Sequence, residues 1–294
     1  MKLPRRLPAR ARSTTSFAVL VTCHLLRLAG ALGVGGSLVT ASAEEPLARG
    51  IQDNSFFIEE AYNQEPGVVQ HIFNAALFIA DSETEIAPTF TQEWPIFTQT
   101  HQFSYTIPYV FAETDDGLAD IRLNYRLQAL MEGEHIPAFA PRFSFVLPTG
   151  DADKGFGHDR LGYEINLPFS KIVADPWSVH FNAGGSIFPD VRGRDLLNYN
   201  LGGSAIYAVT RDFNLMLESI VAGEEDVDVV RRVDRSLTAL VSPGARYAFN
   251  FPGDAQLVVG LGVPIGLTAD SPDWGVFFYC SFEHPFARRA IEEP

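Results

Sequence analysis

Ile121-Arg122-Leu123-Asn124-Tyr125-Arg126-Leu127-Gln128-Ala129 alternates between apolar and polar side chains at every step. The odd positions are apolar, and the even positions carry an arginine or a side-chain amide. Successive side chains of a β-strand point to opposite faces of the sheet, so this pattern predicts a strand with two unlike faces. The same alternation recurs along the chain, and the polar face decides which kind of β protein it builds.

Ten stretches with this alternation lie between His101 and Phe286. They are the stretch quoted above and the ranges 103–111, 139–147, 163–170, 177–187, 197–207, 213–221, 236–250, 256–265 and 274–286. Two more strands are expected before His101, at residues 68–79 and 89–97. We therefore predict an all-β fold of about 12 strands.

The polar faces of these strands carry mainly Ser, Asn, Thr, Gln and Gly. A soluble sandwich tends to place Lys and Glu on its wet faces, but this chain has only Lys2, Lys154 and Lys171. The opposite faces are rich in Phe, Tyr, Leu and Val. This combination is typical of a transmembrane antiparallel up-and-down β-barrel, whose apolar faces meet lipid and whose polar faces line a lumen. Closing the sheet also satisfies every backbone donor and acceptor within the bilayer.

The gaps between the predicted strands alternate in length from residue 130 onward. The short gaps are 132–134, 174–176, 210–212 and 252–254, and the longer gaps are 149–162, 189–195, 223–234 and 268–273. Bacterial outer-membrane barrels have short periplasmic turns and longer outer loops. The alternation therefore predicts a protein of the outer membrane of a Gram-negative bacterium, with both termini in the periplasm.

Residues 1–43 differ in composition from the rest of the chain. They hold six Lys and Arg, no Asp or Glu, an apolar stretch over 17–39 and an Ala-x-Ala sequence at 41–43. These features are typical of a cleaved secretory signal peptide. Its removal leaves 16 basic against 36 acidic residues, which changes the net charge from −14 to −20. A chain this acidic lacks the basic face that nucleic-acid binding needs.

The chain thus divides into four predicted segments. They are the signal peptide at 1–43, a periplasmic linker at 44–54, the barrel at 55–286 and a periplasmic tail at 287–294. Within the barrel, charged and imidazole side chains lie on the polar faces of several strands. We expect them to form either a charged constriction that selects solutes or an ion-pair network that fills a narrow lumen. These residues are Arg122, Arg126, Arg142, Glu164, His180, Glu218, Arg246 and Glu283.

Residues 55–64 read as extended, but Glu59 and Glu60 are neighbours and would point to opposite faces of a strand. One of them would then face lipid, which is costly near the middle of the membrane. We therefore place residues 55–64 in the lumen or at its rim, as a plug or solute site. In the alternative, residues 55–64 form the first strand and residues 89–97 are not a strand of the barrel. The candidate residues of such a site are Glu59, Glu60, Tyr62, Asn63, Gln92, Glu93 and Trp94.

No pattern in the sequence points to catalysis, a metal or a cofactor, because neither a Gly-rich phosphate loop nor a Cys/His cluster occurs. We predict that the protein is not an enzyme. The expected partners are outer-membrane lipid and lipopolysaccharide, a small-molecule solute, and the barrel-assembly machinery. The machinery would bind the last strand, which ends at Phe286.

Several motifs resemble a known bacterial family. They are NSFFIEEAYNQEPGVVQH at 54–71, TFTQEWP at 89–95, HQFSY at 101–105, PRF at 141–143 and LPTGD at 147–151. On these motifs the chain resembles the outer-membrane transporters of the meta pathway of phenol degradation, over nearly all of its length after residue 43. The resemblance implies an outer-membrane barrel that helps small, often hydrophobic, compounds to cross. It supplies no catalytic residues.

The patterning and the resemblance together predict a porin-like channel or transporter for the passive passage of small, aromatic or hydrophobic solutes. The alternative function is that of a structural or surface-adhesion barrel with a closed lumen and no transport. A secreted β-rich binding protein is a third option, and solubility without detergent would distinguish it from a barrel.

Overall fold

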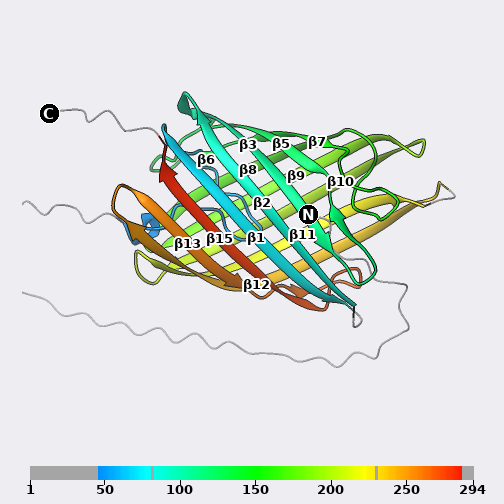
Figure 1. Cartoon of the computed structure of the whole chain (residues 1–294). Coiled ribbons are helices and arrows are strands. Elements are labelled where there is room, and N and C mark those ends of the chain that lie inside the picture. The colour runs from blue at the N-terminus through cyan, green and yellow to red at the C-terminus, as the bar shows by residue number, and fades with distance from the viewer. Residues whose placement is uncertain (1–45, 81–82, 229–230, 287–294) are drawn as a thin grey trace, which may run out of the picture. The chain divides into compact units, whose positions relative to one another are not determined.

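The computed structural model describes residues 46–80, 83–228 and 231–286. They form one antiparallel sheet that closes into a 12-strand barrel (Figure 1). The wall consists of β1 (Val68–Ala80), β2 (Glu83–Ile96), β3 (Thr98–Phe111), β5 (Ile121–Leu127), β7 (Arg142–Leu147), β8 (Gly162–Ala174), β9 (Trp177–Val191), β10 (Arg194–Ala208), β11 (Phe213–Val227), β12 (Val233–Phe251), β13 (Ala255–Gly262) and β15 (Trp274–Pro285). Three short segments supplement it: β4 (Asp116–Leu118), β6 (Ala138–Phe139) and β14 (Ile265–Gly266).

The first and last strands close the barrel. β1 and β15 pair antiparallel from Val68 opposite Pro285 to Ile79 opposite Trp274. Each remaining strand pairs with its neighbours in chain order, so the predicted up-and-down barrel is confirmed. Among the described residues, no helix is both long enough and apolar enough to cross a bilayer.

Burial alternates along the strands as the sequence pattern predicts. In β5, Tyr125 is exposed on the outer surface while its neighbours Asn124 and Arg126 are buried. The other strands likewise expose large apolar side chains, among them Phe145, Tyr163, Phe181, Leu217, Tyr247 and Phe278. Burying one such side chain away from water is worth about 1.5–3 kcal/mol, so this outer surface is stable in lipid rather than in water.

The two ends of the barrel differ. At the turn end, short turns join β8 to β9, β10 to β11 and β12 to β13, and β1 begins beside the end of β15. The other end is the loop end, which carries the long connection 148–161. The short turns predicted at 174–176, 210–212 and 252–254 therefore all lie at one end.

Four predicted segments have different bounds in the structure. The short gap at 132–134 is part of a longer strap, residues 128–141, in which β6 pairs with β8. The strand predicted at 139–147 breaks at Pro141, because proline has no N–H for the ladder. At the loop end, Arg192 and Gly193 alone connect β9 to β10, with φ of 51° and 81°. These positive angles suit a two-residue hairpin turn, so strand replaces most of the loops predicted at 189–195 and 223–234.

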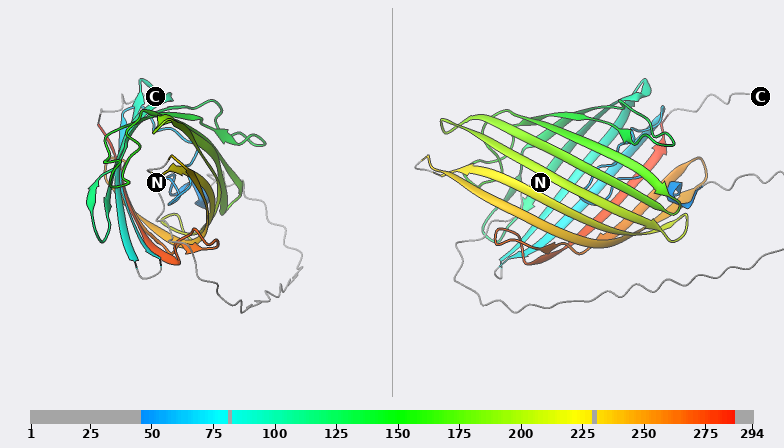
Figure 2. Two further views of the ribbon diagram at one scale, coloured as in Figure 1. Left: turned by 90° about the vertical axis from the view of Figure 1, so that its right-hand side faces the viewer. Right: turned by 180° about the vertical axis from the view of Figure 1, so that it is seen from behind.

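The chain before β1 enters the barrel. A single 3-10 turn, η1 (Leu47–Arg49), lies at the turn end, where the Ala48 N–H donates to the Asp175 carboxylate at 3.0 Å. The end-on view in Figure 2 shows the blue N-terminal segment inside the ring of strands. The segment then returns to the turn end, where β1 begins.

Candidate functional site

We call residues 51–64 the plug. Within this described segment there is neither helix nor strand. Its buried residues begin at Ile51 and Asp53, so the lumenal segment starts earlier than the predicted boundary at residue 55. The barrel wall holds the plug largely through side chains that bond to the plug backbone.

Residues 51–54 form the first part of the plug, which we call the entering limb. Arg246 of β12 holds this limb in place. Its Nη1 donates to the carbonyl oxygens of Asp53 and Asn54 at 2.7 Å each, and its Nη2 donates to that of Ile51 at 3.3 Å. The carboxylate of Asp53 in turn accepts hydrogen bonds from Gln70 of β1 at 2.8 Å and from the hydroxyls of Tyr279 and Ser281 of β15. This limb is thus tied to both strands that close the barrel.

Two side chains hold the backbone at the middle of the plug. Glu218 of β11 accepts the Phe57 N–H at 3.0 Å. Asn182 of β9 accepts the Glu59 N–H at 2.8 Å and donates to the Glu59 carbonyl at 2.9 Å. The amide of Asn182 therefore pairs with one plug residue much as a neighbouring strand would.

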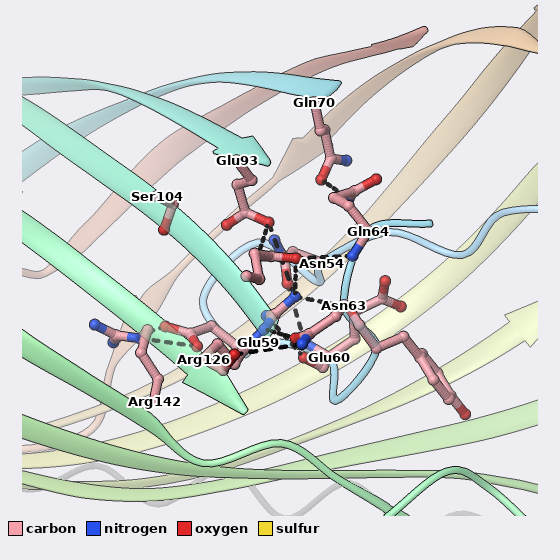
Figure 3. Close-up of polar contacts among 12 residues, drawn as sticks. Asn54, Glu59, Glu60, Asn63, Gln64, Gln70, Glu93, Ser104, Arg126 and Arg142 are labelled. Atoms are coloured by element: carbon pink, nitrogen blue, oxygen red, sulfur yellow. Dashed lines mark hydrogen bonds and ion pairs between the residues drawn. The ribbon is translucent and has the colours of Figure 1, made fainter. Parts of the chain in front are cut away.

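Residues 60–64, which we call the returning limb of the plug, are held by Arg126 of β5 (Figure 3). Arg126 donates to Asn63 Oδ1 at 2.8 Å and to the carbonyl oxygens of Tyr62 at 2.6 Å and Glu60 at 3.3 Å. Two wall residues and the first residue of the strap accept plug N–H groups at 2.7–2.8 Å: Ser170 from Ala61, Gln102 from Gln64 and Gln128 from Asn63. A buried polar backbone is stable only when its groups are paired, and here the wall supplies the partners.

An aromatic ring anchors the apolar part of the plug. Phe56 stacks on Phe277 with ring centroids 5.5 Å apart and lies 5.8 Å from Tyr279. Glycines of β12 and β13 make room for it, because a Cβ at Gly244, Gly260 or Gly262 would approach the Phe56 ring to within 2.5–2.8 Å. The ring therefore occupies a seat that even alanine would obstruct.

A cluster of four charged side chains surrounds Glu59; we call it the charge cluster. Arg142 of β7 contacts Glu59 at 2.7 Å and Glu164 of β8 at 2.8 Å. Arg122 of β5 contacts the other side of Glu164 at 3.3 Å. The four side chains keep exposures of 13–27%, which makes them more accessible than the plug core. Of these four residues, only Glu59 belongs to the plug, and the other three belong to the barrel wall.

The strap anchors the plug at the turn end. Tyr62 donates from its hydroxyl to Glu132 at 2.6 Å, and Lys171 and the Ile172 N–H donate to the same carboxylate at 3.0 and 2.8 Å. Burial opposes ionisation of Glu132, but these hydrogen bonds outweigh it and lower its pKa. Burial and the bond to Glu132 raise the pKa of Tyr62. The pair is therefore a neutral phenol donating to an ionised carboxylate.

Among the predicted lumen residues, Arg126, Glu218 and Arg246 contact the plug. Arg122, Arg142 and Glu164 belong to the charge cluster. His180 and Glu283 complete the predicted set. His180 Nδ1 lies 2.7 Å from the Ser170 Oγ, which itself binds the plug. Glu283 lies on β15 opposite Gln70 and Gln256. Ser170 and His180 are buried beneath the plug, with exposures of 1% and 6%.

The predicted plug set divides between the two faces of the wall. Glu59, Glu60, Tyr62 and Asn63 lie in the lumen, and Glu93 of β2 accepts a bond from Gln102 there at 2.7 Å. Gln92 and Trp94 lie on the outer surface, where Gln92 accepts from the Tyr105 hydroxyl and Trp94 stacks on Phe103. Alternation along β2 requires this separation, because Glu93 lies between them.

Sequence reasoning missed several residues that hold the plug. They are Asp53, Phe56, Gln70, Gln102, Gln128, Ser170, Asn182 and Tyr279. Most of the wall residues among them carry amide or hydroxyl side chains on polar strand faces. The sequence pattern does not distinguish such side chains that bind the plug from those that only line the lumen. Among the described residues, no group of three or more His, Cys, Asp or Glu is placed to hold a metal ion.

The described residues thus form a transmembrane β-barrel that encloses the plug, residues 51–64. No family model and no curated protein sequence matches the chain. Among solved structures, an outer membrane channel from Pseudomonas putida F1 shares the fold, with a TM-score of 0.56 and 14% identity over 76% of this chain and 97% of that one.

Two further solved structures are similar at a lower level. The NanC porin has a TM-score of 0.45 and 8% identity, over 73% of this chain and 98% of that chain. The translocator domain of the autotransporter NalP from Neisseria meningitidis has a TM-score of 0.40 and 11% identity, over 74% and 86%.

Proposed function

We propose that the protein is an outer-membrane channel for the passive passage of small solutes and that the plug closes its lumen at rest. The observation that carries this proposal is the way in which the plug is held. Side chains bind it, while the backbone ladder of the barrel closes between β1 and β15 without it. The plug can therefore move without breaking a strand pairing.

The energetics favour a plug that can leave. A hydrogen bond to the plug contributes about 0.5–1.5 kcal/mol when both groups are neutral and about 1.5–3 kcal/mol when one is charged, because water replaces the partner when the plug undocks. The wall arginines and amides line a polar passage once they are free of it. The proposal includes a location in the outer membrane of a Gram-negative bacterium, with both termini in the periplasm. A polar passage through the barrel is consistent with that location.

The seat of Phe56 supports an aromatic or hydrophobic solute. Three glycines and the rings of Phe277 and Tyr279 surround a space that one aromatic ring fills. A solute with such a ring could use the same seat after the plug moves. An aromatic solute agrees with the resemblance to transporters of the meta pathway of phenol degradation. We include membership of that family in the proposal.

A structural or adhesion barrel is the second candidate, because the plug fills the lumen in this structure. Single-channel recordings in planar bilayers and solute flux into liposomes separate the two. We expect small, infrequent openings from the wild type and larger ones from Gly262→Ala, whose new methyl group clashes with Phe56 at 2.8 Å.

Gly203→Ala is the matched control, because a Cβ there lies 3.6 Å from its nearest neighbour. It should conduct like the wild type. Absence of conductance and flux from both the wild type and Gly262→Ala, in protein that is folded by circular dichroism, would exclude the channel.

A further inference from the structure

The guanidinium group of Arg142 contacts both the barrel wall and the plug. Nη1 donates to Asn124 at 3.1 Å and to Ser144, and Nη2 donates to Glu164 at 2.8 Å. These three partners belong to the barrel wall. They fix the plane of the guanidinium group whether or not the plug is present.

Nε and Nη2 form the edge of Arg142 that faces the plug. Nε donates to Oε2 of Glu59 at 3.1 Å, and Nη2 forms an ion pair with Oε1 at 2.7 Å. This is a two-pronged contact in which parallel N–H groups match the two oxygens of a carboxylate. The wall thus presents a preoriented carboxylate receptor, and a side chain of the same protein occupies it.

We propose that this edge of Arg142 is a binding site for the carboxylate of a small organic acid and that Glu59 is an internal competitor for it. The proposal rests on the proposed channel function, since it names a class of solute that the lumen recognises. A solute carboxylate takes the place of the Glu59 carboxylate and makes the same two contacts with Arg142. No covalent step is involved.

The local charge favours this exchange. Within the charge cluster, Arg122 and Arg142 balance Glu59 and Glu164. When the Glu59 side chain turns away, the wall residues alone carry one net positive charge. A monocarboxylate restores neutrality, whereas an uncharged solute leaves Arg142 with two unpaired donors, which is costly in a partly buried site.

The backbone and side chain of Glu59 are held by different partners. Asn182 holds the backbone through two hydrogen bonds, while Arg142 holds the carboxylate. The carboxylate can therefore turn away while the plug stays docked. The Glu59 side chain is 27% exposed, which gives a solute access to the contact.

The test uses full-length protein in detergent micelles, with benzoate as the probe and benzamide as its uncharged counterpart. Equilibrium dialysis measures the Kd of each probe. We expect Glu59→Gln to bind benzoate at least tenfold more tightly than the wild type. The reason is that a tethered carboxylate competes at an effective concentration on the order of millimolar. Benzamide should show no comparable gain.

Two further variants control for indirect effects. Glu59→Gln combined with Arg142→Lys should lose the gain, because lysine lacks the two-pronged edge. Glu134→Gln removes a carboxylate that is 90% exposed on the strap and should bind benzoate like the wild type. Unchanged benzoate binding in Glu59→Gln, an equal gain for benzamide, or a gain retained with Arg142→Lys would each overturn the site.

The dialysis result is independent of transport. If neither the wild type nor Gly262→Ala conducts but Glu59→Gln gains benzoate affinity, the channel proposal fails and the carboxylate site remains. If the channel conducts and the gain is absent, the site fails and the channel remains.

Discussion

Arg246 of the barrel wall donates a hydrogen bond of 2.7 Å to the carbonyl oxygen of Asp53, which lies 193 residues earlier in the chain. Arg246 is only 2% exposed, so the plug backbone provides the polar surroundings that its charge needs. The contact therefore stabilises both partners: the plug is held in the lumen, and a buried arginine is solvated by carbonyl oxygens.

Replacing Arg246 should release the entering limb of the plug. We expect Arg246→Gln to weaken plug docking by about 1–3 kcal/mol, because carbonyl oxygens of the plug lose charged donors. The measurement is the frequency of channel openings in planar bilayers. Arg235→Gln is the control, since Arg235 is 76% exposed and its ion pair with Glu225 is worth about 0–1 kcal/mol. Equal opening frequencies in the two variants would contradict this role.

Removing the ring of Phe56 should empty its seat. Phe56 is 5% exposed, and Phe→Ala at a buried site costs about 3–5 kcal/mol. We expect Phe56→Ala to open more often than the wild type and to show faster hydrogen exchange over residues 51–64. Phe97→Ala deletes a ring that is 94% exposed and should change neither quantity. If exchange over the plug is the same in both variants, Phe56 is not an anchor.

The hydrogen bond between Tyr62 and Glu132 should make the docking of the returning limb depend on pH. Hydrogen bonds lower the pKa of Glu132 below its ordinary value of 4.5, so its contribution is complete above that value and is lost as the pH falls through the folded pKa. At pH 7 we expect Glu132→Gln to open more often than the wild type. The difference should vanish at acidic pH, where Glu132 of the wild type is protonated and therefore as neutral as the glutamine of the variant. A difference that persists at the lowest pH would exclude titration of Glu132 as its cause.

The two faces of β2 and β3 should respond differently to mutation. Gln102 is 1% exposed and accepts the Gln64 N–H, so Gln102→Leu leaves a buried donor unpaired at a cost of about 1–3 kcal/mol. We expect more frequent openings from this variant. Trp94→Ala alters only the outer surface and should leave the openings unchanged. A strong effect of Trp94→Ala on conductance would contradict its place on the outer surface and would favour a role for Trp94 in the lumen.

The alternation of side chains was enough to predict which residues of a strand face outward. It holds for Tyr125 between Asn124 and Arg126, and it would also have separated Trp94 and Gln92 from Glu93. The strap was not predictable in this way. Pro141 ends the strand that the pattern continued, and the pairing of β6 with β8 depends on a partner outside the local sequence.

The plug shows the same limit. The adjacent carboxylates of Glu59 and Glu60 were a local reason to keep residues 55–64 out of the wall, and both lie in the lumen. Their partners could not be read from the sequence, because Arg126, Arg142 and Asn182 come from three strands far along the chain. An amide on a polar face has the same signature whether it meets water or a plug backbone.

The sequence by itself thus determined the class of fold, since a period of two with lipid-compatible side chains on one face permits few structures other than a closed barrel. The tertiary structure alone decided that the lumen is filled and how. Closing the sheet places residues from distant strands around one backbone, and their exact register selects which carbonyl, N–H or carboxylate each one meets. That choice is made by three-dimensional distance, which a one-dimensional pattern does not contain.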